Sequence, residues 1–159
     1  MIKSFKISIL AAVTLLVSSC ELDLLDNPNA VTPANTDVNF LLNRIELSYS
    51  GHFNQLSDPG MRLTRMLNQG AAFYENAVAP GGFDGTWQVA YADILQDVKT
   101  LIPIAEAGGL TVHSGIARTI RASVLVNMVD AFGDIPYSEA LDPTNFNPKI
   151  DGGASIYTA

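Results

Sequence analysis

A run of apolar residues between positions 87 and 105 places the strongest constraint on how this chain folds. They recur at intervals of three and four residues without a break, which is the spacing of one face of an α-helix. The set is Trp87, Ala90, Tyr91, Ile94, Leu95, Val98, Leu101, Ile102 and Ala105. We expect a helix that Thr86 caps, that Pro103 kinks or shortens, and that Gly108-Gly109 stops.

Three further segments carry the same spacing. The first runs from about 38 to 55, and the second starts at Asp58-Pro59, with Pro in the favoured first-turn position. The third runs from about 112 to 132 and carries two adjacent apolar stripes, so it is buried on several sides. The stripes are Ile116, Ile120, Val124 and Met128, and beside them Leu125, Val129 and Phe132. No useful strand alternation appears, so we predict an all-α fold of antiparallel helix pairs, a tetratricopeptide-like α-solenoid.

The C-terminal residues 151–159 look like a loop leading into a further helix that the chain lacks. We therefore expect the solenoid to be incomplete at its C-terminus. Val124, Leu125, Val126, Met128 and Val129 cannot all face the other three helices, so part of this surface is expected to stay uncovered.

The N-terminus has the pattern of an export signal. Residues 1–6 contain two lysines and no acid, and residues 7–17 form an apolar stretch of eleven residues. A spanning helix needs about 20 apolar residues, so this stretch is too short to be a permanent anchor. The run Val17-Ser18-Ser19-Cys20 looks like a lipobox, and Cys20 is the only cysteine in the chain. We expect residues 1–19 to be removed, Cys20 to carry the lipid, residues 20–36 to form a flexible tether, and residues 37–159 to fold.

The charge of the chain restricts its partners. The net charge is −7, and loss of Lys3 and Lys6 with the signal makes it −9. Such a surface repels phosphate backbones and anionic lipid, so we predict no nucleic-acid binding and attachment to a membrane through the lipid alone. One cysteine and two distant histidines, His52 and His113, offer no metal site, and no cofactor is expected. Both histidines are interpreted as surface or capping residues.

Several motifs together resemble the SusD/RagB family of nutrient-binding outer-membrane lipoproteins of Bacteroidetes. They are the lipobox, the tether run Leu24-Leu25-Asp26-Asn27-Pro28-Asn29, the Trp87 helix, and the pair Arg118 and Arg121 leading to Phe132-Gly133-Asp134-Ile135-Pro136-Tyr137. The family is longer, so the chain looks like its N-terminal part. The resemblance implies a lipid-anchored protein facing outside that binds a nutrient, an oligosaccharide above all, and passes it to a SusC-like TonB-dependent transporter. It implies binding without bond-breaking chemistry, hence no catalytic residues.

Candidate ligand contacts lie off the apolar stripes, around the Ala-Pro-Gly-Gly stretch at 79–82. They are Phe73, Tyr74, Glu75, Asn76, Phe83 and Asp84. Aromatic faces with planar hydrogen-bonding groups suit sugars, and loops on a rigid frame commonly bind ligands. The structural alternative, with similar weight, is that Phe73 and Phe83 pack the loop down.

Other conspicuous residues are interpreted structurally. Trp87 and Tyr91 lie on the core stripe. Asp130, Asp134 and Glu139 lie at one helix end and its loop, where capping and loop hydrogen bonding are more fitting roles than paired-acid catalysis. A second functional class stays open: a helical-repeat lipoprotein that binds only another protein and no small ligand.

Overall fold

The computed structural model describes residues 37–68, 79 and 81–159. All of them lie in one compact unit that spans Pro33–Ala159. Its described part is mainly helical and also contains one antiparallel pair of strands, each two residues long. The all-α prediction is confirmed, whereas a repeating solenoid stays a prediction. Among the described residues, no helix has the length and apolarity needed to cross a membrane.

Helix α2 (Val38–Leu63) is one helix of 26 residues, so the prediction of two helices divided near residue 56 was wrong. Asp37 is its N-cap residue, and the Asp37 side chain accepts a hydrogen bond from the backbone N–H of Asn39 at 2.8 Å. Pro59 lies inside the helix instead of starting a new one. The ion pair of Asp58 with Arg62, one turn apart at 2.7 Å, spans the proline turn and favours its helical geometry.

The predicted 87–105 helix is present as three consecutive helical segments: α3 (Asp84–Gln88), the π-helix η3 (Val89–Leu95) and α4 (Gln96–Ala107). One detail of the prediction was wrong: Thr86 is not a cap but lies buried inside α3, whose N-cap position is Phe83. Pro103 lies inside α4, which continues to Ala107 and ends at Gly108, as the glycine pair predicted. A kink at Pro103 stays a prediction. Helix α5 (Thr111–Phe132) agrees with the predicted bounds.

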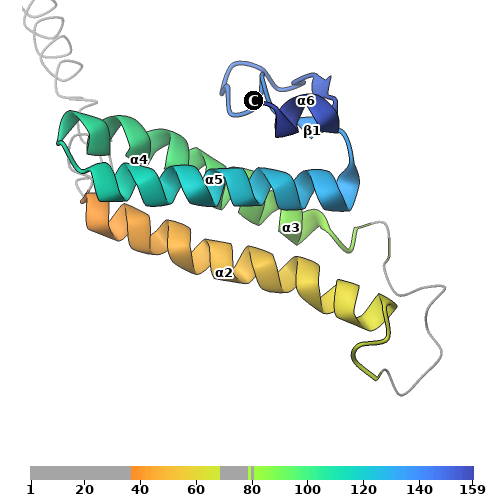
Figure 1. The fold of residues 1–159 in the computed structure, drawn as a ribbon. Coiled ribbons are helices and arrows are strands. Elements are labelled where there is room, and N and C mark those ends of the chain that lie inside the picture. Colours follow the sequence, from red (N-terminus) through yellow and green to blue (C-terminus); the bar gives the residue numbers. More distant parts are fainter. Residues whose placement is uncertain (1–36, 69–78, 80) are drawn as a thin grey trace, which may run out of the picture. The chain divides into compact units, whose positions relative to one another are not determined.

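These helices share one core (Figure 1). Helix α2 packs against η3, α4 and α5, and α4 packs against α5. The three-residue connection after Ala107 makes α4 and α5 neighbours of opposite direction, as a short helix–helix loop does. The side chains of Ile45, Ile94, Leu101 and Met128 are fully buried where the helices meet. Both predicted stripes of α5 contribute to the core.

The segment after α5 folds back on that helix. Gly133 ends α5 at φ +81° and ψ −115°, a backbone conformation that suits glycine. Strand β1 (Ile135–Pro136) then pairs with β2 (Ile150–Asp151), and the short helix α6 (Gly153–Tyr157) follows. Helix α6 packs on α5, with Ile156 buried.

The second α5 stripe is therefore better covered than expected. The prediction of a loop over residues 151–159 was wrong in part, because residues 153–157 form α6. Part of the α5 surface was expected to stay uncovered: Val126 is 37% exposed, whereas Val124, Leu125, Met128 and Val129 are buried.

His52 is a further correction. The prediction placed it on the surface or at a cap, but its side chain is fully buried within α2. Neither ring nitrogen has a hydrogen-bond partner in the described chain, and burial lowers the pKa of His52. Its ring therefore packs as a neutral, largely apolar group. His113 does fit the surface assignment: its Nε2 lies 3.0 Å from Oδ1 of Asn39.

Candidate functional site

A groove of about 500 Å³ lies along α4 and α5 and is closed on one side by the loop that follows β1. Its lining is Tyr91, Leu95, Lys99, Ile102, Pro103, Arg118, Arg121, Leu125, Pro136, Tyr137, Ser138, Ala140 and Leu141. We call this the α4–α5 groove. A smaller hollow of about 210 Å³ adjoins it and shares Arg118, Arg121, Leu125 and Tyr137. Both volumes are in or near the range of small-molecule sites.

The wall of the groove formed by residues 136–141 is attached to the helices at two points. The hydroxyl of Tyr91 donates a hydrogen bond to the carbonyl of Pro136 at 2.6 Å. Burial raises the pKa of Tyr91 to about 12, so the hydroxyl keeps its proton and remains a donor. Lys99 donates from Nζ to the carbonyl of Leu141, also at 2.6 Å. The wall therefore has a defined position against η3 and α4.

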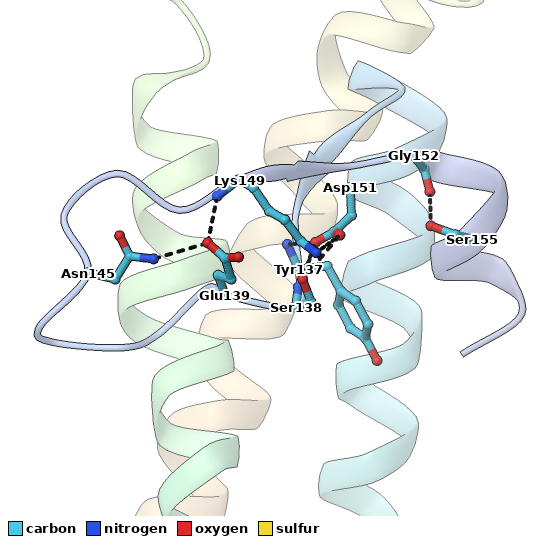
Figure 2. Close-up of polar contacts among 8 residues, drawn as sticks. All are labelled: Tyr137, Ser138, Glu139, Asn145, Lys149, Asp151, Gly152 and Ser155. Carbon is cyan, nitrogen blue, oxygen red and sulfur yellow. Dashed lines mark hydrogen bonds and ion pairs between the residues drawn. The ribbon is translucent and has the colours of Figure 1, made fainter.

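Asp151 supplies a third attachment, shown in Figure 2. Its carboxylate accepts hydrogen bonds from the backbone N–H groups of Tyr137 at 3.2 Å and Ser138 at 2.7 Å, and from the Ser138 hydroxyl at 2.9 Å. Lys149 Nζ lies 3.5 Å away. The N–H of Ser138 is the main reason that the pKa of Asp151 is lowered. We call these four residues the Asp151 clasp; the ring of Tyr137 points away from it (Figure 2).

The carboxylates of the predicted acidic cluster each hold a different part of this C-terminal segment. Glu139 accepts from the side-chain amide of Asn145 and the backbone N–H of Lys149, both at 3.2 Å (Figure 2). Asp134 accepts from the N–H of Gly153 at 2.9 Å. Asp130 accepts from the hydroxyl of Tyr157. The structural interpretation of this cluster is confirmed. Within the described residues, no group of three or more Asp, Glu, His or Cys residues is arranged to hold a metal ion.

An aromatic cluster lies at the start of the 84–107 helical stretch. Trp87 stacks on Tyr91 with ring centroids 5.6 Å apart and an interplanar angle of 12°, and it contacts Phe132 at 4.8 Å. Phe83 meets Phe132 edge-on at 5.3 Å. Trp87 and Tyr91 are half-buried against the core, as their structural interpretation predicted.

Of the six binding residues predicted from the sequence, two are among the residues that the structure describes. Phe73, Tyr74, Glu75 and Asn76 lie outside the described residues, as does Cys20. Phe83 packs on Phe132, the contact that its structural alternative anticipated. Asp84 is exposed in the first turn of α3. Their role in binding stays a prediction.

Comparison with known proteins assigns the family. A family model described as SusD-like, starch-binding and associating with the outer membrane matches residues 31–159. The chain belongs to the SusD-like family. No curated protein matches the chain. Membership places it among proteins that bind starch or another nutrient and associate with the outer membrane, a family of binding proteins and not of enzymes.

In this SusD-like chain the groove brings together residues that sequence reasoning did not assign to a site. Lys99, Arg118, Arg121, Tyr137 and Ser138 come from three separate segments. One signal was present: Arg118 and Arg121 are three residues apart, which places them on the same face of α5. The Pro136-Tyr137 motif contributed to the family resemblance of the sequence but was not assigned to a binding site, although it forms part of the groove wall.

Proposed function

We propose that this chain is a lipid-anchored outer-membrane protein that binds an oligosaccharide in the α4–α5 groove and passes it to a TonB-dependent transporter. The observation that carries the proposal is the groove itself, in a chain of a starch-binding family. The hand-off to a SusC-like transporter rests on the family resemblance of the sequence. An anchor through Cys20, with the protein facing outside, rests on the lipobox and on the acidity of the chain.

The chemistry of the groove suits a sugar. Leu95, Ile102 and Leu125 offer an apolar floor for the C–H face of a pyranose ring. Arg118, Arg121 and the hydroxyl of Tyr137 offer hydrogen-bonding groups around it. Such a mixture of apolar lining and a few polar groups is typical of small-molecule sites.

The groove wall is also held before any ligand arrives. Tyr91, Lys99 and Asp151 fix the backbone of residues 136–141 through hydrogen bonds of 2.6 to 3.2 Å. Binding to a fixed wall avoids part of the entropy cost of ordering a loop.

The loop that includes Phe83 and Asp84 remains a second candidate contact region. Because Phe83 already packs on Phe132, Asp84 is the described member of that set with an exposed polar group to offer. The alternative function is binding of another protein without any small ligand. It predicts that neither the α4–α5 groove nor the loop with Phe83 and Asp84 binds an oligosaccharide.

The test is calorimetric titration of the detergent-solubilised, lipidated chain with a set of neutral and acidic oligosaccharides. We expect Tyr137→Ala and Asp84→Ala to weaken binding, with the larger effect for Tyr137. Phe146→Ala is the matched control, because this aromatic side chain is 94% exposed and lies outside the groove. A chain that forms a complex with a transporter but binds none of the oligosaccharides would favour the protein-only alternative.

A further inference from the structure

The α4–α5 groove is cationic although the chain is acidic. The whole sequence has nine Lys and Arg against sixteen Asp and Glu. Three of those nine cations, Lys99, Arg118 and Arg121, line the groove, and its lining contains no Asp or Glu. Positive charge is therefore concentrated where a ligand would enter, against the overall balance of the protein.

The three cations differ in what they already bind. Arg118 forms an ion pair with Glu106 at 2.5 Å. Lys99 donates to the carbonyl of Leu141 and lies close enough to Asp142 to help lower the pKa of that carboxyl, after the larger effect of hydrogen bonds from Thr144. Arg121 has neither a hydrogen bond nor an ion pair with any part of the chain that the structure describes. Among the described residues, nothing therefore occupies the guanidinium of Arg121, and it can bind a ligand.

Arg121 lines both the groove and the adjoining hollow, so it stands between them. A guanidinium presents N–H donors in a planar fork that matches the two oxygens of a carboxylate. The hydroxyl of Tyr137, which lines the same two spaces, makes no hydrogen bond within the described chain and supplies a neutral donor beside it. Leu95 and Leu125 provide the apolar surface for a ring.

We infer that the α4–α5 groove selects an acidic sugar, with Arg121 binding the carboxylate of a uronic-acid residue. The inference rests on the proposed function, since it takes the groove to be the glycan site. A neutral glycan would leave the guanidinium of Arg121 without an anionic partner, whereas a uronic acid gives it a charge-assisted pair. Lys99, which also lines the groove, adds a further positive charge to it.

The experiment titrates the full lipidated chain in detergent with trigalacturonate and with maltotriose. We expect trigalacturonate to bind at least about tenfold more tightly, and the difference to shrink as salt is raised. Arg121→Gln should reduce trigalacturonate affinity about tenfold or more and maltotriose affinity by a clearly smaller factor, because glutamine keeps a hydrogen-bond donor but loses the charge. Arg121→Lys keeps the charge but loses the planar fork of donors, so its trigalacturonate affinity should lie between that of the wild type and that of Arg121→Gln.

Arg62→Gln is the matched control. It removes the same charge from an exposed arginine on α2 whose partner is Asp58, outside the groove. Equal loss of trigalacturonate affinity in Arg62→Gln and Arg121→Gln would overturn the inference, because it would show a general charge effect. Equal affinity of the wild-type chain for the two sugars would also overturn it while leaving glycan binding intact. Failure of both sugars to bind would count against the proposed function and the inference together.

Discussion

Gly153→Ala tests whether α6 is packed on α5 as closely as the structure shows. A Cβ atom at this position would lie 2.8 Å from Cγ1 of Val129 and 3.1 Å from the carbonyl oxygen of Gly133. Val129 is β-branched and within a helix, so its side chain has little freedom to rotate away. The second neighbour is backbone. Neither can yield without moving α6.

Two routes give a similar magnitude for the loss of stability. If the methyl group is forced in, overpacking costs about 1–3 kcal/mol. If α6 lifts away instead, the burial of Ile156 is lost, worth about 1.5–3 kcal/mol. The bond from Gly153 N–H to Asp134 is then lost too, worth about 1 kcal/mol. The smaller of the two costs determines the outcome, so we expect a decrease of about 2 kcal/mol in the free energy of unfolding.

The assay is urea unfolding followed by far-ultraviolet circular dichroism and by the fluorescence of Trp87, the only tryptophan in the chain. Gly115→Ala is the matched control. Gly115 lies inside α5 on an exposed face, and a Cβ there meets nothing within 4 Å. It should stabilise the protein by about 0.5–1 kcal/mol through helix propensity. Wild-type stability of Gly153→Ala, alongside the expected gain for Gly115→Ala, would refute the close packing of α6.

Two further predictions concern the anchor and the clasp. Cys20→Ala should abolish lipid modification and partition into detergent, measured by metabolic lipid labelling and phase separation; membrane retention equal to wild type would contradict it. The pKa of Asp151 is lower in the folded protein than in the unfolded chain. The ionised carboxylate therefore contributes stability at a pH above its unfolded-state pKa, and this contribution is lost as the pH falls through its folded-state pKa. We therefore expect the urea midpoint of the wild type to drop more steeply below about pH 4 than that of Asp151→Asn, and parallel curves would argue against the clasp.

The parts of the fold that the sequence predicted well are those with a regular helical period and a clear stop. Helix α5 and the end of α4 have both, with glycine at the two helix ends. The errors come from residues whose local preference was overridden. Pro59 favours a first turn, yet α2 continues through it. Histidine is intermediate in its tendency to be buried, so its type does not predict burial, yet the side chain of His52 is fully buried in this unit.

The π-helix η3 could not be read from spacing, because the apolar residues from Trp87 to Val98 recur at three and four residues throughout and give no sign of i→i+5 bonds. The α4–α5 groove escaped prediction for a different reason. Its lining comes from residues 91–103, 118–125 and 136–141, and none of these segments is unusual by itself. What creates the site is the way the chain after Gly133 folds back, and the bonds that decide this join residues 13 to 45 positions apart.

Those same bonds link the stability of the C-terminal segment to the shape of the groove. Asp151 fixes the backbone of Tyr137 and Ser138, and Asp134 fixes the start of α6 through Gly153. The residues between β1 and β2 are held by Glu139. A change that loosens any of these bonds frees the wall that carries the Tyr137 ring while leaving Arg121 in place on α5. If the groove binds an acidic sugar as proposed, affinity for the sugar ring and attraction for its carboxylate depend on different elements, and variants of the clasp and of Arg121 should separate the two.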